Sequence, residues 1–309
     1  MLRLIRIENL LFIALFQYLL RYCIILPVLN SYNIAPVMTD WQFSILVLTT
    51  ICMAASGNVI NDYFDIYIDR TNRPNLVVLD RIMPRKNAIL IHVILTLTGI
   101  FMGLYIAFAT RRATYVWLFL GIPTLLWFYS TRFKRQLLIG NIIVALLTAA
   151  MVYVVISVEL SFIRQTGMDT TKSVGCIAAW TYTVGYTFFA FLCNLSREII
   201  KDIEDIEGDK EYGCHTIPVI LGVEYTKVIV SALHAMSIIM LWGVYYTSPS
   251  IQSHPFVELY LSVGLTIPII LNTLLLYKAR EKKDFHQCSI NSKYIMLIGV
   301  LSMLYFWLT

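Results

Sequence analysis

The hydrophobic residues of this chain fall into long runs that short polar segments separate. A helix that crosses a membrane needs roughly 20 mostly apolar residues. On that template the sequence predicts nine spans, at about residues 9–29, 43–61, 88–109, 114–130, 137–160, 174–195, 224–246, 256–277 and 293–308. The intervals contain Gly, Pro, Asn and charged residues, as loops do. The pattern therefore predicts an all-α, polytopic membrane protein that forms a single domain over residues 1–309.

The composition supports a membrane protein and excludes several other classes. Of the 309 residues, 58% are hydrophobic and 14% are charged. Soluble domains carry roughly a quarter charged residues. A chain this poor in charge is not a disordered protein, a nucleic-acid-binding arm or a water-exposed globular domain.

The distribution of Lys and Arg predicts the orientation in the membrane. The N-terminal segment and the even-numbered loops, counted with the adjoining span ends, hold 19 of the 24 Lys and Arg residues, and the odd-numbered loops hold 4. Basic residues concentrate on the cytoplasmic side. We therefore expect a multi-pass protein of the cell inner membrane, with the N-terminus and even-numbered loops in the cytoplasm and the C-terminus outside.

The remaining basic residue, Arg21, lies inside the first span. A charge in the hydrocarbon region is costly, so Arg21 needs either a route for its guanidinium to reach the interface or an internal partner. The sequence leaves these two alternatives open.

The acidic residues gather at the predicted cytoplasmic ends of two spans. Ten of the 19 Asp and Glu residues lie in the windows 61–69 and 198–211. Both windows contain the spacing DxxDxxxD, and its members are Asp62, Asp65 and Asp69 in the first and Asp202, Asp205 and Asp209 in the second. The two sets are offset by 140 residues, which suggests two similar halves, about 1–136 and 137–309.

Spacings of three and four residues place side chains on one helical face. Asn58 is expected to continue the first acidic stripe, and Glu198 the second, along the end of the sixth span. Like charges one turn apart destabilise a helix unless cations bind there. Hard oxygen ligands favour Mg²⁺, and basic residues in the same loops complete a diphosphate site. A single acidic helix end is usually a solvated cap, but two matched stripes on one membrane face favour a shared site.

Several motifs resemble those of the UbiA superfamily of intramembrane prenyltransferases. Residues 61–69 resemble its NDxxDxxxD signature, residues 202–209 its DxxDxxGD motif, and residues 216–222 the TxPVxLG continuation. Supporting matches are Arg6 and Asn9 at the start of the first helix, Asn72-Arg73-Pro74, and Tyr129-Ser130 followed by Lys134-Arg135. The loop after Pro74 departs from the family pattern, and this departure leaves the acceptor in doubt.

The resemblance implies a UbiA-like helical bundle with its active site toward the cytoplasmic side. Two Mg²⁺ ions would be held by the six motif aspartates, with Asp65, Asp69, Asp202, Asp205 and Tyr129 as the catalytic residues. Substrate-binding residues would be Asn61, Arg70, Arg73, Lys134 and Lys201. The implied reaction moves an isoprenyl group from an allylic prenyl diphosphate to a hydrophobic or amphipathic acceptor among membrane lipids.

The acceptor remains open at this stage. The pattern is most similar to the branch that alkylates geranylgeranylglyceryl phosphate, and the alternative is an aromatic acceptor of the hydroxybenzoate or dihydroxynaphthoate type. A rival from another class is a divalent-cation or phosphate transporter, although transporters place their acids near the bilayer midplane. No nucleic-acid partner is expected, and the sequence does not indicate an oligomeric state.

Overall fold

The computed structural model describes residues 2–72, 74 and 77–308. The regular elements of these residues are helical, and nine segments are long and apolar enough to cross a membrane. They are Ile7–Ser31 (α1 Ile7–Leu19, η1 Leu20–Ile25, α2 Leu26–Ser31), α3 Asp40–Asn72, α4 Arg85–Ala109, α5 Ala113–Thr131, α6 Ile139–Arg164, α7 Val174–Glu204, α10 Val223–Thr247, Val257–Lys278 (α12 Val257–Leu259, η3 Tyr260–Thr266, α13 Ile267–Lys278) and α14 Lys282–Leu308. Short helices η2 Phe133–Arg135, α8 Ile206–Glu211, α9 Ile217–Leu221 and α11 Pro249–Gln252 lie between them. The predicted all-α polytopic fold is confirmed.

Three helices extend well beyond the apolar runs from which they were predicted. Helix α3 continues from the expected end near residue 61 to Asn72, α7 continues from 195 to Glu204, and α14 begins at Lys282 rather than near 293. A hydropathy window ends where charges begin, whereas backbone hydrogen bonding continues in water. The two C-terminal extensions carry six of the ten acidic residues of the two windows.

The second acidic stripe is not on one continuous helix, and this part of the prediction is wrong. Helix α7 ends at Glu204, Asp205 has φ −99° and ψ 10°, and α8 starts at Ile206. The break places Asp202 on α7 and Asp209 on α8. The first window has the same spacing of like charges on a continuous helix, so a distinguishing feature here is the glycine at position 208, which disfavours a helix.

Two of the spans contain a π-helical segment, and a proline follows each one closely. Leu20–Ile25 precedes Pro27, and Tyr260–Thr266 precedes Pro268. A proline ring clashes with the carbonyl four residues earlier and cannot donate a hydrogen bond. The wider turn accommodates this defect without ending the span.

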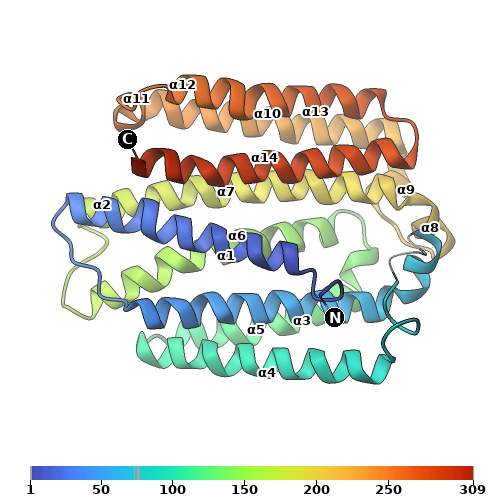
Figure 1. Cartoon of the computed structure of the whole chain (residues 1–309), viewed down its shortest axis with the longest axis horizontal. Helices are drawn as coiled ribbons and strands as arrows, with labels where there is room; N and C mark the ends of the chain where they lie inside the picture. Colours follow the sequence, from blue (N-terminus) through green and yellow to red (C-terminus); the bar gives the residue numbers. More distant parts are fainter. Residues whose placement is uncertain (1, 73, 75–76, 309) are drawn as a thin grey trace.

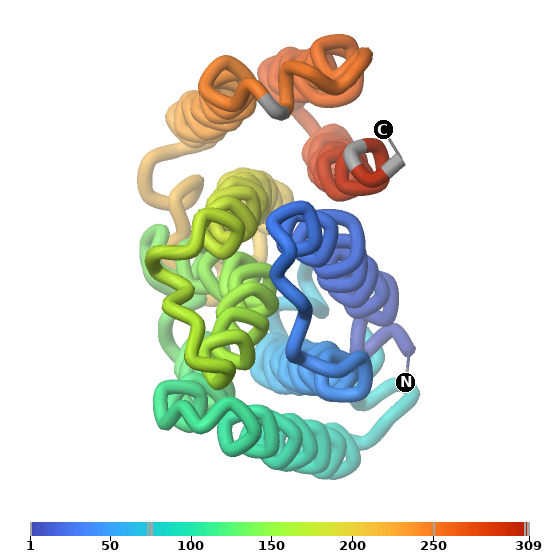
Figure 2. Tube along the Cα trace, turned by 90° about the vertical axis from the view of Figure 1, so that its left-hand side faces the viewer, coloured from blue at the N-terminus to red at the C-terminus, as the bar shows by residue number. Residues whose placement is uncertain are grey.

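The two helices that carry the acidic motifs run in the same direction and end at the same end of the bundle (Figure 1). The hypothesis of two similar halves requires this arrangement. Helix α3 packs against α4 and α5, and α7 packs against α6, α10 and α14. Viewed from the opposite end, α4 and α5 lie at one side of the cross-section and the C-terminal helices at the other (Figure 2).

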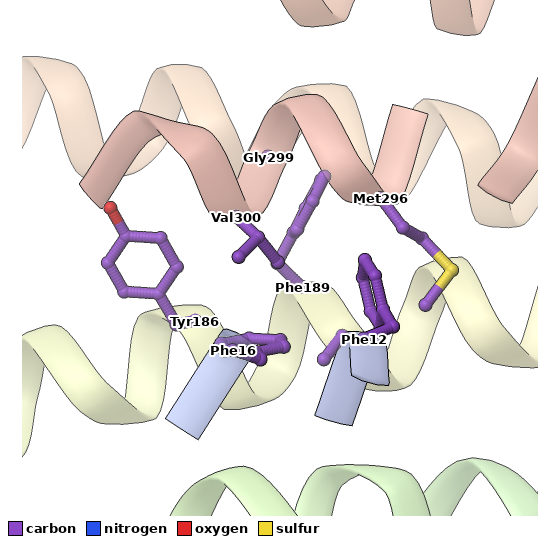
Figure 3. A pocket seen from close by; sticks show the side chains of 8 residues that line it. Phe12, Phe16, Tyr186, Phe189, Met296, Gly299 and Val300 are labelled. Carbon is purple, nitrogen blue, oxygen red and sulfur yellow. The ribbon is translucent and has the colours of Figure 1, made fainter. Parts of the chain in front are cut away.

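The space between α1, α7 and α14 is apolar and aromatic (Figure 3). Its lining consists of Phe12, Phe16, Tyr186, Phe189, Ala190, Met296, Gly299 and Val300. Helix α14 approaches closely at Gly299, where an added Cβ would lie 2.5 Å from Cε1 of Phe189. The part of α7 that precedes its acidic residues therefore packs against apolar and aromatic side chains.

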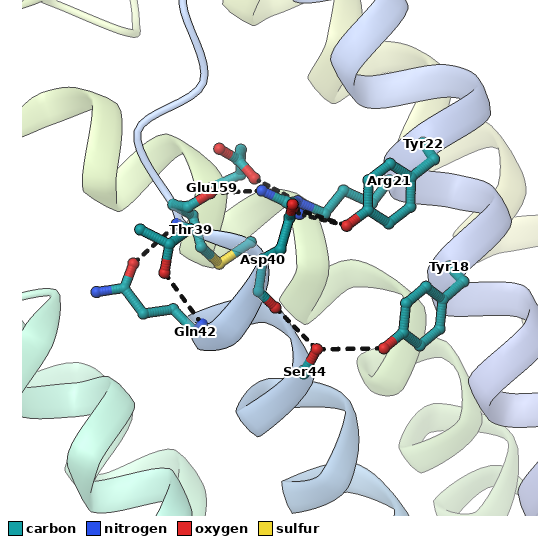
Figure 4. A network of polar contacts seen from close by, with 9 residues as sticks. Tyr18, Arg21, Tyr22, Thr39, Asp40, Gln42, Ser44 and Glu159 are labelled. Atoms are coloured by element: carbon teal, nitrogen blue, oxygen red, sulfur yellow. Dashed lines mark hydrogen bonds and ion pairs between the residues drawn. The ribbon is translucent and has the colours of Figure 1, made fainter.

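Arg21 has an internal partner, which resolves the alternatives that the sequence left open (Figure 4). Its Nε donates to Oε2 of Glu159 at 3.1 Å, and its Nη1 donates to Oδ1 of Asp40 at 2.7 Å. The guanidinium also lies over the ring of Phe43, 4.7 Å from its centroid. Arg21 and Glu159 are 1% and 0% exposed, so the pair joins η1 to α6 inside the protein.

Candidate active site

The two acidic windows meet around one ammonium group, that of Lys134. Lys134 Nζ forms an ion pair with Oδ2 of Asp65, which is 3% exposed. The same ammonium interacts electrostatically with Asp69 on α3 and with Asp209 on α8. Segments 140 residues apart in sequence thus place carboxylates around a single cation.

The turn that carries Lys134 is positioned by its neighbours on both sides. The backbone N–H of His215, which follows the second motif, donates to the carbonyl of Arg135 at 2.8 Å. Helix α6 begins close to the turn because residue 140 is glycine: a Cβ there would lie 2.9 Å from Cα of Lys134. The second motif and the start of α6 therefore hold Lys134 in place.

Three of the other motif aspartates accept hydrogen bonds, two of them from distant segments. Arg6 Nη2 donates to Oδ1 of Asp62 at 2.8 Å. Asn141 on α6 donates to Oδ2 of Asp202 at 2.8 Å, and the Thr216 hydroxyl donates to Oδ2 of Asp209 at 3.1 Å. These donors balance carboxylates that would otherwise repel one another.

The electrostatics of the site follow from burial and from these partners. Burial raises the pKa of Asp209 to about 6, although Lys134 and the Thr216 hydroxyl act in the opposite direction. Burial alone would lower the pKa of Lys134, but the Asp65 carboxylate outweighs it and the pKa is raised above its usual range. Lys134 is therefore a fixed positive charge at neutral pH.

The other predicted site residues have different interaction partners, and Lys134 is among those of Tyr129. Tyr129 interacts electrostatically with Lys134 and with carboxylates of both windows. Lys201 pairs with Glu198 at 2.9 Å on α7. Arg70 instead pairs with Asp80 at 3.2 Å, in the loop after α3. Arg73 lies outside the described residues.

The carboxylates do not form a preassembled metal cage. In the described part of the chain, no group of three or more His, Cys, Asp or Glu side chains is arranged to hold a metal ion. Asp62 and Asp65 are instead turned to Arg6 and Lys134. The donor set nevertheless fits Mg²⁺, because it consists of carboxylates and the Asn61 amide, whose buried Oδ1 accepts no hydrogen bond from any described residue.

Comparison with known proteins identifies the family. The sequence profile of the UbiA prenyltransferase family matches residues 24–301. The chain belongs to the UbiA prenyltransferase family. It is an enzyme, a UbiA-type prenyltransferase and a multi-pass integral membrane protein, and the transporter alternative is set aside.

Individual relatives cover most of this UbiA-family chain. The digeranylgeranylglyceryl phosphate synthase of Methanosphaera stadtmanae is 33% identical over 266 residues, which are 83% of this chain and 86% of that protein. A solved structure described as a study of digeranylgeranylglyceryl phosphate synthase in membranes has a TM-score of 0.62 and 24% identity, over 99% and 96% of the two chains. A UbiA homologue from Archaeoglobus fulgidus bound to DMAPP and Mg²⁺ has a TM-score of 0.57 and 16% identity, over 97% and 98%.

Sequence reasoning missed some residues that the UbiA fold brings to the carboxylates. Asn141 had a usable signal, since an amide near the start of an otherwise apolar span demands a polar partner. Arg6 and Thr216 were noted only as family matches, without a role. Lys282 was counted only as a basic loop residue, yet its Nζ lies 3.9 Å from Oδ1 of Asp205.

Proposed function

We propose that this prenyltransferase transfers an isoprenyl group from an allylic prenyl diphosphate to geranylgeranylglyceryl phosphate or a chemically similar lipid acceptor. The observation that carries the site assignment is the ion pair of Lys134 with Asp65, formed from a turn that His215, just after the second motif, contacts through the Arg135 carbonyl. The acceptor assignment is supported by the relative from Methanosphaera stadtmanae, a digeranylgeranylglyceryl phosphate synthase that is 33% identical to this chain.

In this proposal the carboxylates of Asp62, Asp65 and Asp69 on α3, with Asn61, face those of Asp202, Asp205 and Asp209 and together bind two Mg²⁺ ions. The family member from Archaeoglobus fulgidus that binds DMAPP and Mg²⁺ supports the use of this metal. Bound Mg²⁺ neutralises the negative charge that develops on a leaving diphosphate.

Basic side chains of this chain would hold the diphosphate and help it leave. Lys134 forms an ion pair with Asp65, and Arg6 forms one with Asp62. When cations and diphosphate bind, we expect both side chains to turn from the carboxylates to phosphate oxygens. We expect Lys201 to leave Glu198, and Arg70 to leave Asp80, in order to take part.

The bond changes define what else the protein must do. The C1–O bond of the allylic donor breaks, and diphosphate leaves with the electron pair. The hydroxyl oxygen of the acceptor forms the new C–O bond and releases its proton. The protein must keep water from C1 until the acceptor is in place. Tyr129, near the charges of both windows, is the aromatic residue we assign beside the reacting carbon.

The acceptor is tested by offering the purified enzyme several acceptors in one assay. Labelled prenyl diphosphates of different lengths are supplied with geranylgeranylglyceryl phosphate, a hydroxybenzoate and a dihydroxynaphthoate. We expect a labelled lipid product that requires Mg²⁺ and disappears with EDTA. Exclusive labelling of an aromatic acceptor would contradict the lipid assignment while preserving the prenyltransferase chemistry.

We also propose that the acidic end of the bundle faces the cytoplasm of a cell inner membrane. The proposal rests on the concentration of Lys and Arg in the segments at that end. A cysteine introduced as Lys283→Cys, at an exposed position, should react with a membrane-impermeant thiol reagent only when the cytoplasmic face is accessible. Labelling from the outer face of intact cells would show that the acidic end faces the outside.

A further inference from the structure

A direct hydrogen bond joins the two acidic segments next to the proposed metal-binding residues. Asn72 is the last residue of α3, three positions after Asp69, and Gly208 lies in α8, directly before Asp209. The backbone N–H of Gly208 donates to Oδ1 of Asn72 at 3.0 Å. Both residues are buried, so water does not replace this bond.

The approach is so close that position 208 has no space for a side chain. A Cβ built on Gly208 would lie 2.6 Å from each of Cγ, Oδ1 and Nδ2 of Asn72. Glycine is otherwise a poor residue within a helix such as α8. Contact with Asn72 is therefore a physical reason for glycine at this position.

The start of α14 braces the same contact. Lys282 Nζ donates to the backbone carbonyl of Asn72 at 2.7 Å and lies 3.9 Å from Oδ1 of Asp205. Carbonyls in the last turn of a helix have no partner within that helix. Lys282 satisfies one of them and places its charge between the two acidic segments.

We propose that Asn72 is a positioning residue that sets the separation of the two groups of metal-binding carboxylates through the N–H of Gly208. This inference rests on the proposed function, because it assumes that the aspartates bind Mg²⁺. In this role Asn72 contacts Gly208 and not the metal ions or the substrate. It acts by fixing the end of α3, with Asp69, against α8, with Asp209.

The test is a double-mutant cycle that measures metal affinity on the purified full-length protein. Mn²⁺ binding is followed by electron paramagnetic resonance in the presence of inorganic diphosphate, with competition by Mg²⁺ and no prenyl donor. Gly208→Ala and Asn72→Ala should each weaken Mn²⁺ binding by roughly ten- to a hundredfold, as loss of residues that orient metal ligands does. The double variant should bind about as well as Asn72→Ala alone, since removal of the Asn72 side chain gives the new methyl group space.

Gly243→Ala is the matched control, because a Cβ there meets nothing within 4 Å. It should bind Mn²⁺ like the wild type. If Gly208→Ala does not fold, the double variant should fold, because the new methyl group no longer clashes with the Asn72 side chain. Two results would overturn the role of Asn72 while leaving the metal site intact. Either the losses of Mn²⁺ affinity in the two single variants multiply in the double variant, or both single variants bind Mn²⁺ like the wild type. Absence of Mg²⁺-competed binding in the wild type would overturn the metal site and this inference together.

Discussion

Replacing Asp65 with asparagine is expected to reduce prenyl transfer by about a thousandfold, the loss that removal of one charge-stabilising group at a reaction centre typically produces. Asp65 is 3% exposed and is the carboxylate that Lys134 contacts. Asparagine keeps the shape but removes the negative charge, so both the proposed Mg²⁺ ligand and the counter-ion of Lys134 are lost. The measurement is Mg²⁺-dependent transfer of a labelled prenyl group, normalised to the amount of inserted protein.

The matched control for this prediction is Glu207→Gln. Glu207 lies in the second acidic window, but its side chain is exposed and lines a different cleft, with Glu204 and Lys227. Glu207→Gln should leave the transfer rate within about twofold of the wild-type rate, because surface substitutions generally have small effects. Asp205→Asn is expected to behave like Asp65→Asn. Full activity in both aspartate variants would show that the reaction centre lies elsewhere.

The sequence predicts the nine spans because the bilayer imposes a length and a polarity on each of them. Near residues 61–69 it also predicts a cation site, because three carboxylates on one helical face are unfavourable without a cation. Both inferences use local patterns only. The acidic pattern requires α3 to continue past its apolar run to residue 69, but the end of the helix at Asn72 is not predicted, since a helix outside the hydrocarbon no longer needs apolar residues.

The contacts that the sequence could not predict join segments far apart in the chain. Arg6 and Asp62 are separated by 56 residues, Arg21 and Glu159 by 138, and Asn72 and Gly208 by 136. Each pairing depends on how whole helices pack, and a local pattern contains no information about that. The sequence indicates that Arg21 needs a partner but does not identify it.

Replacing Arg21 with methionine is expected to destabilise the protein by about 3–5 kcal/mol, the usual effect of removing one partner of a buried ion pair. Glu159 is fully buried within the fifth span, and Arg21 is its ion-pair partner among the described residues. Without the guanidinium, an uncompensated carboxylate remains buried inside the protein. Thermal unfolding in detergent measures the loss.

Two further variants separate the charge effect from the loss of packing. Arg21→Met combined with Glu159→Met removes both charges and should recover most of the stability, since apolar replacements of buried pairs are often neutral. Asp40→Asn should change stability by less than about 1 kcal/mol, because the Asp40 side chain is 78% exposed. A double variant no more stable than Arg21→Met would show that the loss comes from the packing of the guanidinium on Phe43, not from the unpaired Glu159 carboxylate.

The same variants test whether the charge network is independent of the reaction centre. Asp40 begins α3 and Asp69 lies 29 residues further along it, so at ~1.5 Å per residue the two ends are roughly 44 Å apart. Mutations that far apart with no shared partners normally have additive effects. Arg21→Met should therefore lower the unfolding temperature while the folded fraction binds Mn²⁺ with unchanged affinity. A parallel loss of affinity would mean that α3 transmits strain along its whole length, and that the Arg21–Glu159 ion pair helps to hold the acidic end in register.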